Sequence, residues 1–152
     1  MKTYRMGLVT VAAAAAGLAV VIASQAGAAG NPVEERQGLM KQQGQVMKEA
    51  GAFLAPNAAF DAAKAKTLMA TLSTSADKLH KLYPADSKDA PKTEALPKIW
   101  ENKADFDKRL TELSKLAKDA GGATSADAFK PAYMAIGKAC KDCHDQYRAK
   151  KS

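Results

Sequence analysis

The chain has 152 residues, which suits one compact domain and is too short for two. Its residues are 47% hydrophobic and 26% charged, so a packed core is feasible and wholesale disorder is excluded. The formal charge of +7 admits an acidic protein partner, a membrane surface or nucleic acid, and two cysteines exclude a disulfide-dense scaffold. One disulfide, a metal site, a redox pair and covalent cofactor attachment remain open.

Residues 1–28 are typical of an export signal. Lys2 and Arg5 supply positive charge, and an uncharged apolar stretch follows them. Small residues then provide cleavage sites after Ala26 or Ala28. The sequence therefore predicts removal of this segment.

The alternative for this segment is an uncleaved membrane anchor. Its apolar run, Leu8 to Ala23, is interrupted by Gly17 and is shorter than the roughly 20 residues of a membrane span. We therefore expect a soluble periplasmic domain of residues 29–152 with a formal charge of +5.

The remaining chain predicts four amphipathic helices. After residue 28, valine and isoleucine are scarce and helix-forming residues dominate. The first helix begins at the Asn31 cap and Pro32 and ends before Pro56, and the second runs from Asp61 to Tyr83. The apolar stripes of these two helices comprise Leu39, Met40, Val46, Met47, Ala50 and Leu54, then Ala65, Leu68, Met69, Leu72, Ala76 and Leu79.

A long crossing loop, residues 84–97, is expected next because it contains three prolines. The third helix runs from about Lys98 to Gly121, and the fourth follows a Ser125 cap and begins or bends at Pro131. Their apolar stripes comprise Phe106, Leu110, Leu113, Ala117 and Ala120, then Phe129, Tyr133, Ile136, Cys140 and Tyr147, and Met69 and Met134 are expected on core faces. The predicted fold is an all-α antiparallel four-helix bundle.

The segment Cys140-Lys141-Asp142-Cys143-His144 has the C-x-x-C-H pattern of covalent haem c attachment. On a helix, these cysteines and the histidine lie within about one turn. Two thioethers could then hold the haem edge while the imidazole binds iron. The pattern predicts one covalent haem c, attached near the C-terminus of the last helix.

Three other interpretations of the two cysteines fit the sequence less well. A disulfide would need a tight loop, but the segment is helical, and a thioredoxin-type pair normally follows a strand. A zinc site needs a fourth ligand, and the only other histidine is His80, expected to be solvated near the end of the second helix. A thiol–disulfide oxidoreductase without haem is the least favoured function.

The chain resembles the class II cytochromes c, the cytochrome c′ family, in the position of this motif and in several short stretches. These are Arg36-Gln37, Leu82-Tyr83-Pro84, Leu96-Pro97-Lys98-Ile99-Trp100, Phe106, Gly137-Lys138 and Cys140 to Arg148. The resemblance implies a haem c four-helix bundle over essentially the whole mature chain.

Within that family, the resemblance implies that the residue matching Met40 decides the state of the iron. Cytochromes c′ usually carry an aliphatic residue there and have five-coordinate, high-spin iron that binds NO or CO. A low-spin branch carries methionine, which implies axial ligation by Met40 and His144. From the residues alone, Met40 could instead be a core residue, which is the commonest use of methionine, and Met47 faces the same way. If Met40 does not bind iron, Leu39 is the neighbour that would pack near the haem.

The primary functional prediction is a single-electron carrier with six-coordinate iron and no enzymatic activity. The alternative is a five-coordinate cytochrome c′ that binds NO or CO. Arg36 and Arg148, each one turn from a predicted ligand, could meet the haem propionates or ring edge, as the resemblance also implies. Trp100 is expected to pack on the third helix or contact haem.

The predicted partners are other redox proteins with acidic docking surfaces. The chain carries a local charge of +3 from Lys138 onward, beside the predicted haem edge. Nucleic acid is not expected, because aromatic and basic residues do not alternate as they do in stacking surfaces. Pairing of two chains into a homodimer through the first helix is left open.

Overall fold

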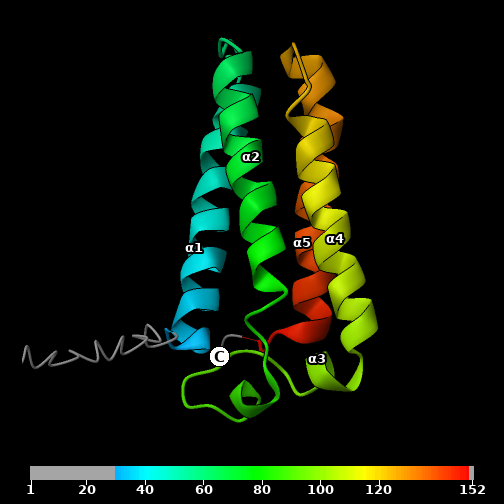
Figure 1. Cartoon of the computed structure of the whole chain (residues 1–152). Coiled ribbons are helices and arrows are strands. Elements are labelled where there is room, and N and C mark those ends of the chain that lie inside the picture. Colours follow the sequence, from blue (N-terminus) through cyan, green and yellow to red (C-terminus); the bar gives the residue numbers. More distant parts are fainter. Residues whose placement is uncertain (1–29, 151–152) are drawn as a thin grey trace, which may run out of the picture.

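The structure, a computed structural model, describes residues 30–150. Four long helices lie side by side and alternate in direction, so the predicted all-α antiparallel four-helix bundle is confirmed (Figure 1). They are α1 (Pro32–Gly51), α2 (Ala62–Leu79), α4 (Lys103–Ala120) and α5 (Ala126–Tyr147). The short elements are the 3₁₀ turns η1 (Ala52–Leu54) and η2 (Ala85–Ser87) and the one-turn helix α3 (Lys98–Glu101). The predicted export signal lies outside the described residues.

Side-chain caps begin three of the long helices. Asn31, Asp61 and Ser125 each accept a hydrogen bond from a backbone N–H two or three residues later, at 3.0, 2.9 and 3.2 Å. These bonds satisfy N–H groups that have no partner inside the helix. These caps confirm the predicted starts of the first and second helices, and for the last helix they show a start after Ser125 and not at Pro131.

Two predicted helices differ in extent from the structure. The second helix ends at Leu79 and not at Tyr83, because the N–H groups of Lys81 and Leu82 donate to carbonyls three residues earlier and not four. The third is divided at Asn102, whose backbone angles (φ −131°, ψ 53°) are not helical. Asparagine favours such breaks because its side chain competes with helical hydrogen bonds.

Two expectations about the last helix are also corrected. The helix begins at Ala126 and runs through Pro131, which lies within its second turn. Met134 is 62% exposed, so its expected core position was wrong. It lies about 140° around the helix from Phe129 and about 200° from Ile136, on the solvent side.

The core consists of two clusters along the bundle. The far-end cluster joins all four long helices and includes Val46, Ala50, Phe53, Ala65, Met69, Leu72, Ala76, Leu113, Ala117, Ala120, Phe129 and Ile136. The motif-end cluster comprises Leu79, Leu82, Tyr83, Ile99, Phe106, Leu110 and Tyr147. The predicted core position of Met69 is confirmed, because this side chain is fully buried.

The bundle brings three distant segments to its motif end. The start of α1, the crossing segment between α2 and α4, and the end of α5 all lie there (Figure 1). An antiparallel bridge joins Ala95 in the crossing segment to Arg148 after α5. Within residues 30–150, every helix is too short or too polar to span a membrane.

Candidate haem site

A cavity of about 430 Å³ lies at the motif end of the bundle. This size is within the range of small-molecule and cofactor sites. Its walls come from the three segments that meet there. The lining residues are Arg36, Gln37, Met40 and Lys41 from α1, Tyr83, Glu94, Ala95, Ile99 and Phe106 from the middle of the chain, and Cys143, His144, Tyr147 and Arg148 from its end.

The C-x-x-C-H segment forms the last two turns of α5, with both cysteines free and partly buried. Cys143 and His144 line the cavity. Cys140 lies one turn earlier and packs against the far-end cluster. The helical spacing therefore directs Cys143 and His144 toward the cavity and places Cys140 on the preceding turn of α5.

Burial controls the protonation of the motif side chains. It raises the pKa of the Cys143 thiol to about 11 and also raises the pKa of Cys140. Burial, followed by the charge of Arg148, lowers the pKa of His144. At neutral pH the thiols keep their protons and the imidazole is neutral, with a lone pair available to a metal. A thiol–disulfide oxidoreductase needs the opposite shift, toward a stable thiolate.

The two methionines of α1 have different surroundings. Met40 lines the cavity and packs beside the motif-end cluster, whereas Met47 packs against the far-end cluster. Leu39 also packs beside the motif-end cluster but does not line the cavity. The structure thus separates two side chains that helical periodicity could not distinguish.

Arg36 is 3% exposed and its guanidinium is occupied by the crossing segment. One nitrogen donates to the carbonyl of Leu82 (3.0 Å) and to the Ser87 hydroxyl (2.9 Å). The other donates to the Ser87 carbonyl (3.3 Å) and the Thr93 hydroxyl (2.5 Å). The guanidinium also lies 4.8 Å from the Tyr83 ring centre. Arg36 therefore ties α1 to the crossing segment, a role that local spacing did not predict.

The remaining cations near the motif are partly neutralised. Lys138 pairs with Asp142, and Lys141 pairs with Asp145, each one turn apart on α5. Arg148 is exposed and lines the cavity. The local positive charge predicted from the sequence is therefore concentrated toward the last residues of the chain.

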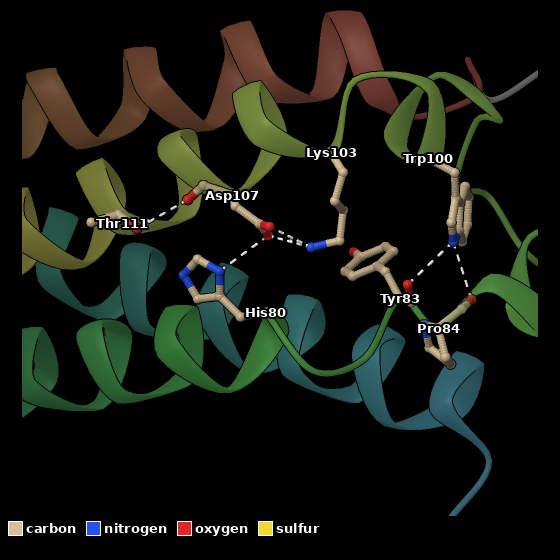
Figure 2. A network of polar contacts seen from close by, with 7 residues as sticks. All are labelled: His80, Tyr83, Pro84, Trp100, Lys103, Asp107 and Thr111. Atoms are coloured by element: carbon tan, nitrogen blue, oxygen red, sulfur yellow. Dashed lines mark hydrogen bonds and ion pairs between the residues drawn. The ribbon is translucent and has the colours of Figure 1, made fainter.

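His80 and Trp100 lie outside the cavity lining and have polar partners (Figure 2). His80 was expected to be solvated, but its Nδ1 lies 3.1 Å from an Asp107 carboxylate oxygen and its side chain is 29% exposed. Lys103 donates to the same carboxylate at 2.5 and 2.6 Å. The Trp100 Nε1–H donates to the carbonyls of Tyr83 (3.2 Å) and Pro84 (3.1 Å). Trp100, in α3, thus packs against the residues that follow α2.

The residues around the cavity fit a covalently attached haem. The protonated thiols of Cys140 and Cys143 and the neutral imidazole of His144 lie close together on α5. Aromatic and aliphatic side chains form the cavity walls. The cavity lining includes three cationic side chains and one carboxylate, an excess of positive charge that suits the two acidic propionates of haem. The cations are Arg36, Lys41 and Arg148, and the carboxylate is Glu94. Fold and site together define a helical-bundle haem c protein.

Comparison with known proteins identifies the family. The family model described as "Cytochrome C'" matches residues 31–148. A cytochrome c′ of Rhodopseudomonas palustris is 40% identical over 139 residues, covering 90% of this chain and 94% of the relative. A solved cytochrome c′ structure from that organism has a TM-score of 0.75 at 38% identity, covering 80% of this chain and 98% of the other. The chain belongs to the cytochrome c′ family.

Two further relatives show the range of this family. A cytochrome c-556 of R. palustris is 33% identical over 140 residues, covering 89% of this chain and 94% of the relative. A solved cytochrome c′ described by its ligand-controlled dimer dissociation is 28% identical with a TM-score of 0.69, covering 78% of this chain and 95% of the other.

Family membership confirms the coarser functional predictions. The chain is a haem c protein of a family of electron carriers and gas binders, which are not typical enzymes. On the finer choice, the 40% identical relative bears the name cytochrome c′, which is the name of the alternative and not of the primary prediction. The ligand residues themselves stay predictions.

Proposed function

We propose that this protein carries single electrons with a haem c bonded to Cys140 and Cys143, and with His144 and Met40 as the axial ligands. The observation that carries the proposal is that Met40 of α1 and His144 of α5 line one cavity. When bound, haem iron supplies a one-electron couple whose potential depends on its axial ligands.

The chain's own residues would prepare the site for this role. The neutral imidazole of His144 offers a lone pair, and the Met40 thioether offers a soft donor that would occupy the position a gas needs. Phe106 and Tyr83, both buried, form an aromatic inner wall. Arg148 offers an exposed cation to a propionate, whereas Arg36 would act from its buried position in the wall.

Optical spectra of the purified protein test the methionine ligand. We expect a low-spin spectrum in both oxidation states that becomes high-spin in Met40→Ala. Met47→Ala is the matched control, because it removes a methionine from the same helix but from the far-end cluster. A high-spin ferric wild type, or identical spectra for the two variants, would remove Met40 from the ligand set.

The second candidate is a five-coordinate cytochrome c′ in which Met40 lines the cavity without binding iron. The relative at 40% identity that bears the cytochrome c′ name supports this form. Here we expect a high-spin ferric wild type that binds CO promptly on reduction, with Met40→Ala changing the rate of CO binding but not the resting spectrum.

We further propose that residues 1–28 are removed during export to the periplasm, and that the redox partners are acidic proteins. N-terminal sequencing of the periplasmic protein tests the first statement, with a start at Gly27 or Ala29 expected. Arg148 is exposed and lines the cavity, so Arg148→Glu should slow electron exchange with an acidic redox protein at low salt. Sedimentation of the haem-loaded protein tests whether two copies form a homodimer.

A further inference from the structure

The phenol of Tyr147 links the end of α5 to α4. Tyr147 is the last residue of α5, three residues after His144, and its side chain is 2% exposed and lines the cavity. Its hydroxyl donates to an Asp105 carboxylate oxygen at 2.6 Å. The same oxygen accepts the Nε–H of Arg109 at 2.7 Å. One carboxylate therefore joins the haem-motif helix to the helix packed beside it.

The charges in this cluster strengthen the link. Hydrogen bonds from Arg109 and Tyr147 lower the pKa of Asp105, so the carboxylate is ionised at neutral pH. Burial, together with that carboxylate, raises the pKa of Tyr147 to about 12. The proton stays on the phenol, and a neutral donor then faces an anionic acceptor, which makes a short and strong hydrogen bond.

Other contacts restrain the same turn from different directions. The Tyr147 ring meets Phe106 edge to face, with ring centres 5.4 Å apart. Its carbonyl accepts the N–H of Leu96 at 3.0 Å, and the Ala149 N–H donates to the Glu94 carbonyl at 2.8 Å. Phe106 and Asp105 both belong to α4, and the Asp105 bond is the side-chain hydrogen bond from α4 among these restraints. Without it, the ring could slide along Phe106 while the backbone bridge stayed closed.

We infer that Asp105, held in place by Arg109, is a positioning residue that fixes the rotation of the last turn of α5 through Tyr147. Because His144 begins this last turn, its rotation sets the direction in which the imidazole enters the cavity. The inference rests on the proposed function, in which His144 binds the iron. Asp105 does not itself line the cavity.

The test compares two tyrosine variants of the full haem-loaded chain. Tyr147→Phe removes only the hydroxyl that reaches Asp105. Tyr133→Phe is the matched control, because its hydroxyl also joins α5 to another element, donating to the Met47 carbonyl at 3.1 Å, but at the far end. The readouts are the ferric electron paramagnetic resonance spectrum, which depends on imidazole orientation, and amide hydrogen exchange in the last turn of α5.

We expect Tyr147→Phe to change the ferric g values and to accelerate exchange of the Arg148 amide roughly tenfold, as loss of a charge-assisted hydrogen bond implies. Tyr133→Phe should leave both unchanged. Identical g values in wild type and Tyr147→Phe would overturn the inference, as would the same change in both variants.

Substitutions of Asp105 separate position from charge. Asp105→Asn keeps an oxygen that accepts from Tyr147 and should retain the wild-type g values, whereas Asp105→Ala should reproduce Tyr147→Phe. Equal changes in the two Asp105 variants would show an effect of charge and overturn the positioning role. Failure of the proposed function can be told apart from failure of this inference. If the proposed function is wrong, the wild type lacks a haem c spectrum or the His144→Ala variant keeps the wild-type ligation, and neither result depends on an Asp105 variant.

Discussion

Replacement of Arg36 by methionine should destabilise the bundle strongly, although Arg36 is a single residue near the start of α1. Methionine keeps much of the buried volume but removes every hydrogen-bond donor. The Leu82 and Ser87 carbonyls and the Ser87 and Thr93 hydroxyls would each lose a partner. An unsatisfied buried acceptor costs about 1–3 kcal/mol.

The variant also relieves a cost of the wild type. The Arg36 guanidinium is buried, and this desolvation lowers its pKa. Removing a buried cation recovers part of the free energy lost with its hydrogen bonds. We therefore expect a net loss of about 2–4 kcal/mol in the free energy of unfolding. For a domain of this size, the melting temperature should fall by roughly 6–15 °C.

Urea unfolding of the haem-loaded protein, followed by far-ultraviolet circular dichroism, measures this loss. Gln37→Met is the matched control, because Gln37 is the next residue on α1, also lines the cavity and donates one exposed hydrogen bond, to the Lys92 carbonyl at 2.8 Å. Its loss should stay within about 0.5 kcal/mol. If the two variants unfold at the same urea concentration, Arg36 does not tie the crossing segment to α1.

Three further outcomes follow from burial and charge. His80→Ala should lower the free energy of unfolding by less than about 1 kcal/mol and leave the optical spectrum unchanged, because its partner is the partly exposed Asp107; a spectral change would make His80 a ligand. Met69→Ala should cost about 2–5 kcal/mol in urea unfolding, because the side chain is fully buried, and a smaller loss would mean that the site collapses. Burial raises the pKa of Tyr83 to about 12 from 10, so its neutral phenol stabilises the fold below pH 10, and this contribution is lost as the pH rises toward 12. Tyr83→Phe should flatten the stability curve over that pH range, and an unchanged curve would assign the loss to other groups.

Features encoded by neighbouring residues could be predicted from the sequence. The caps at Asn31, Asp61 and Ser125 accept from N–H groups two or three residues away, so the neighbouring sequence is enough to predict them. The haem motif spans five residues on one helix and is equally local. These signals are enough for the four-helix bundle and for the end at which the site lies.

Features that depend on contacts between segments far apart in the sequence could not be predicted in this way. Met40 and Met47 share a helix face, and only the course of α5 decides which one meets the motif. Met134 lies near a core stripe in sequence but on its solvent side. The Asp105–Tyr147 bond joins residues 42 positions apart, and no spacing within one helix indicates it.

The position of the motif explains why so many of these distant contacts gather at one end. Helix ends fray, because their last carbonyls lack partners within the helix, yet Cys143 and His144 lie in the last turns of α5. Residues after Tyr147 continue into backbone bonds with the crossing segment, and Arg36 anchors that segment to α1. Asp105 holds the same turn from α4. A helix end that would fray in isolation is therefore restrained from three sides, which is the rigidity that a covalently attached cofactor with a fixed axial ligand needs.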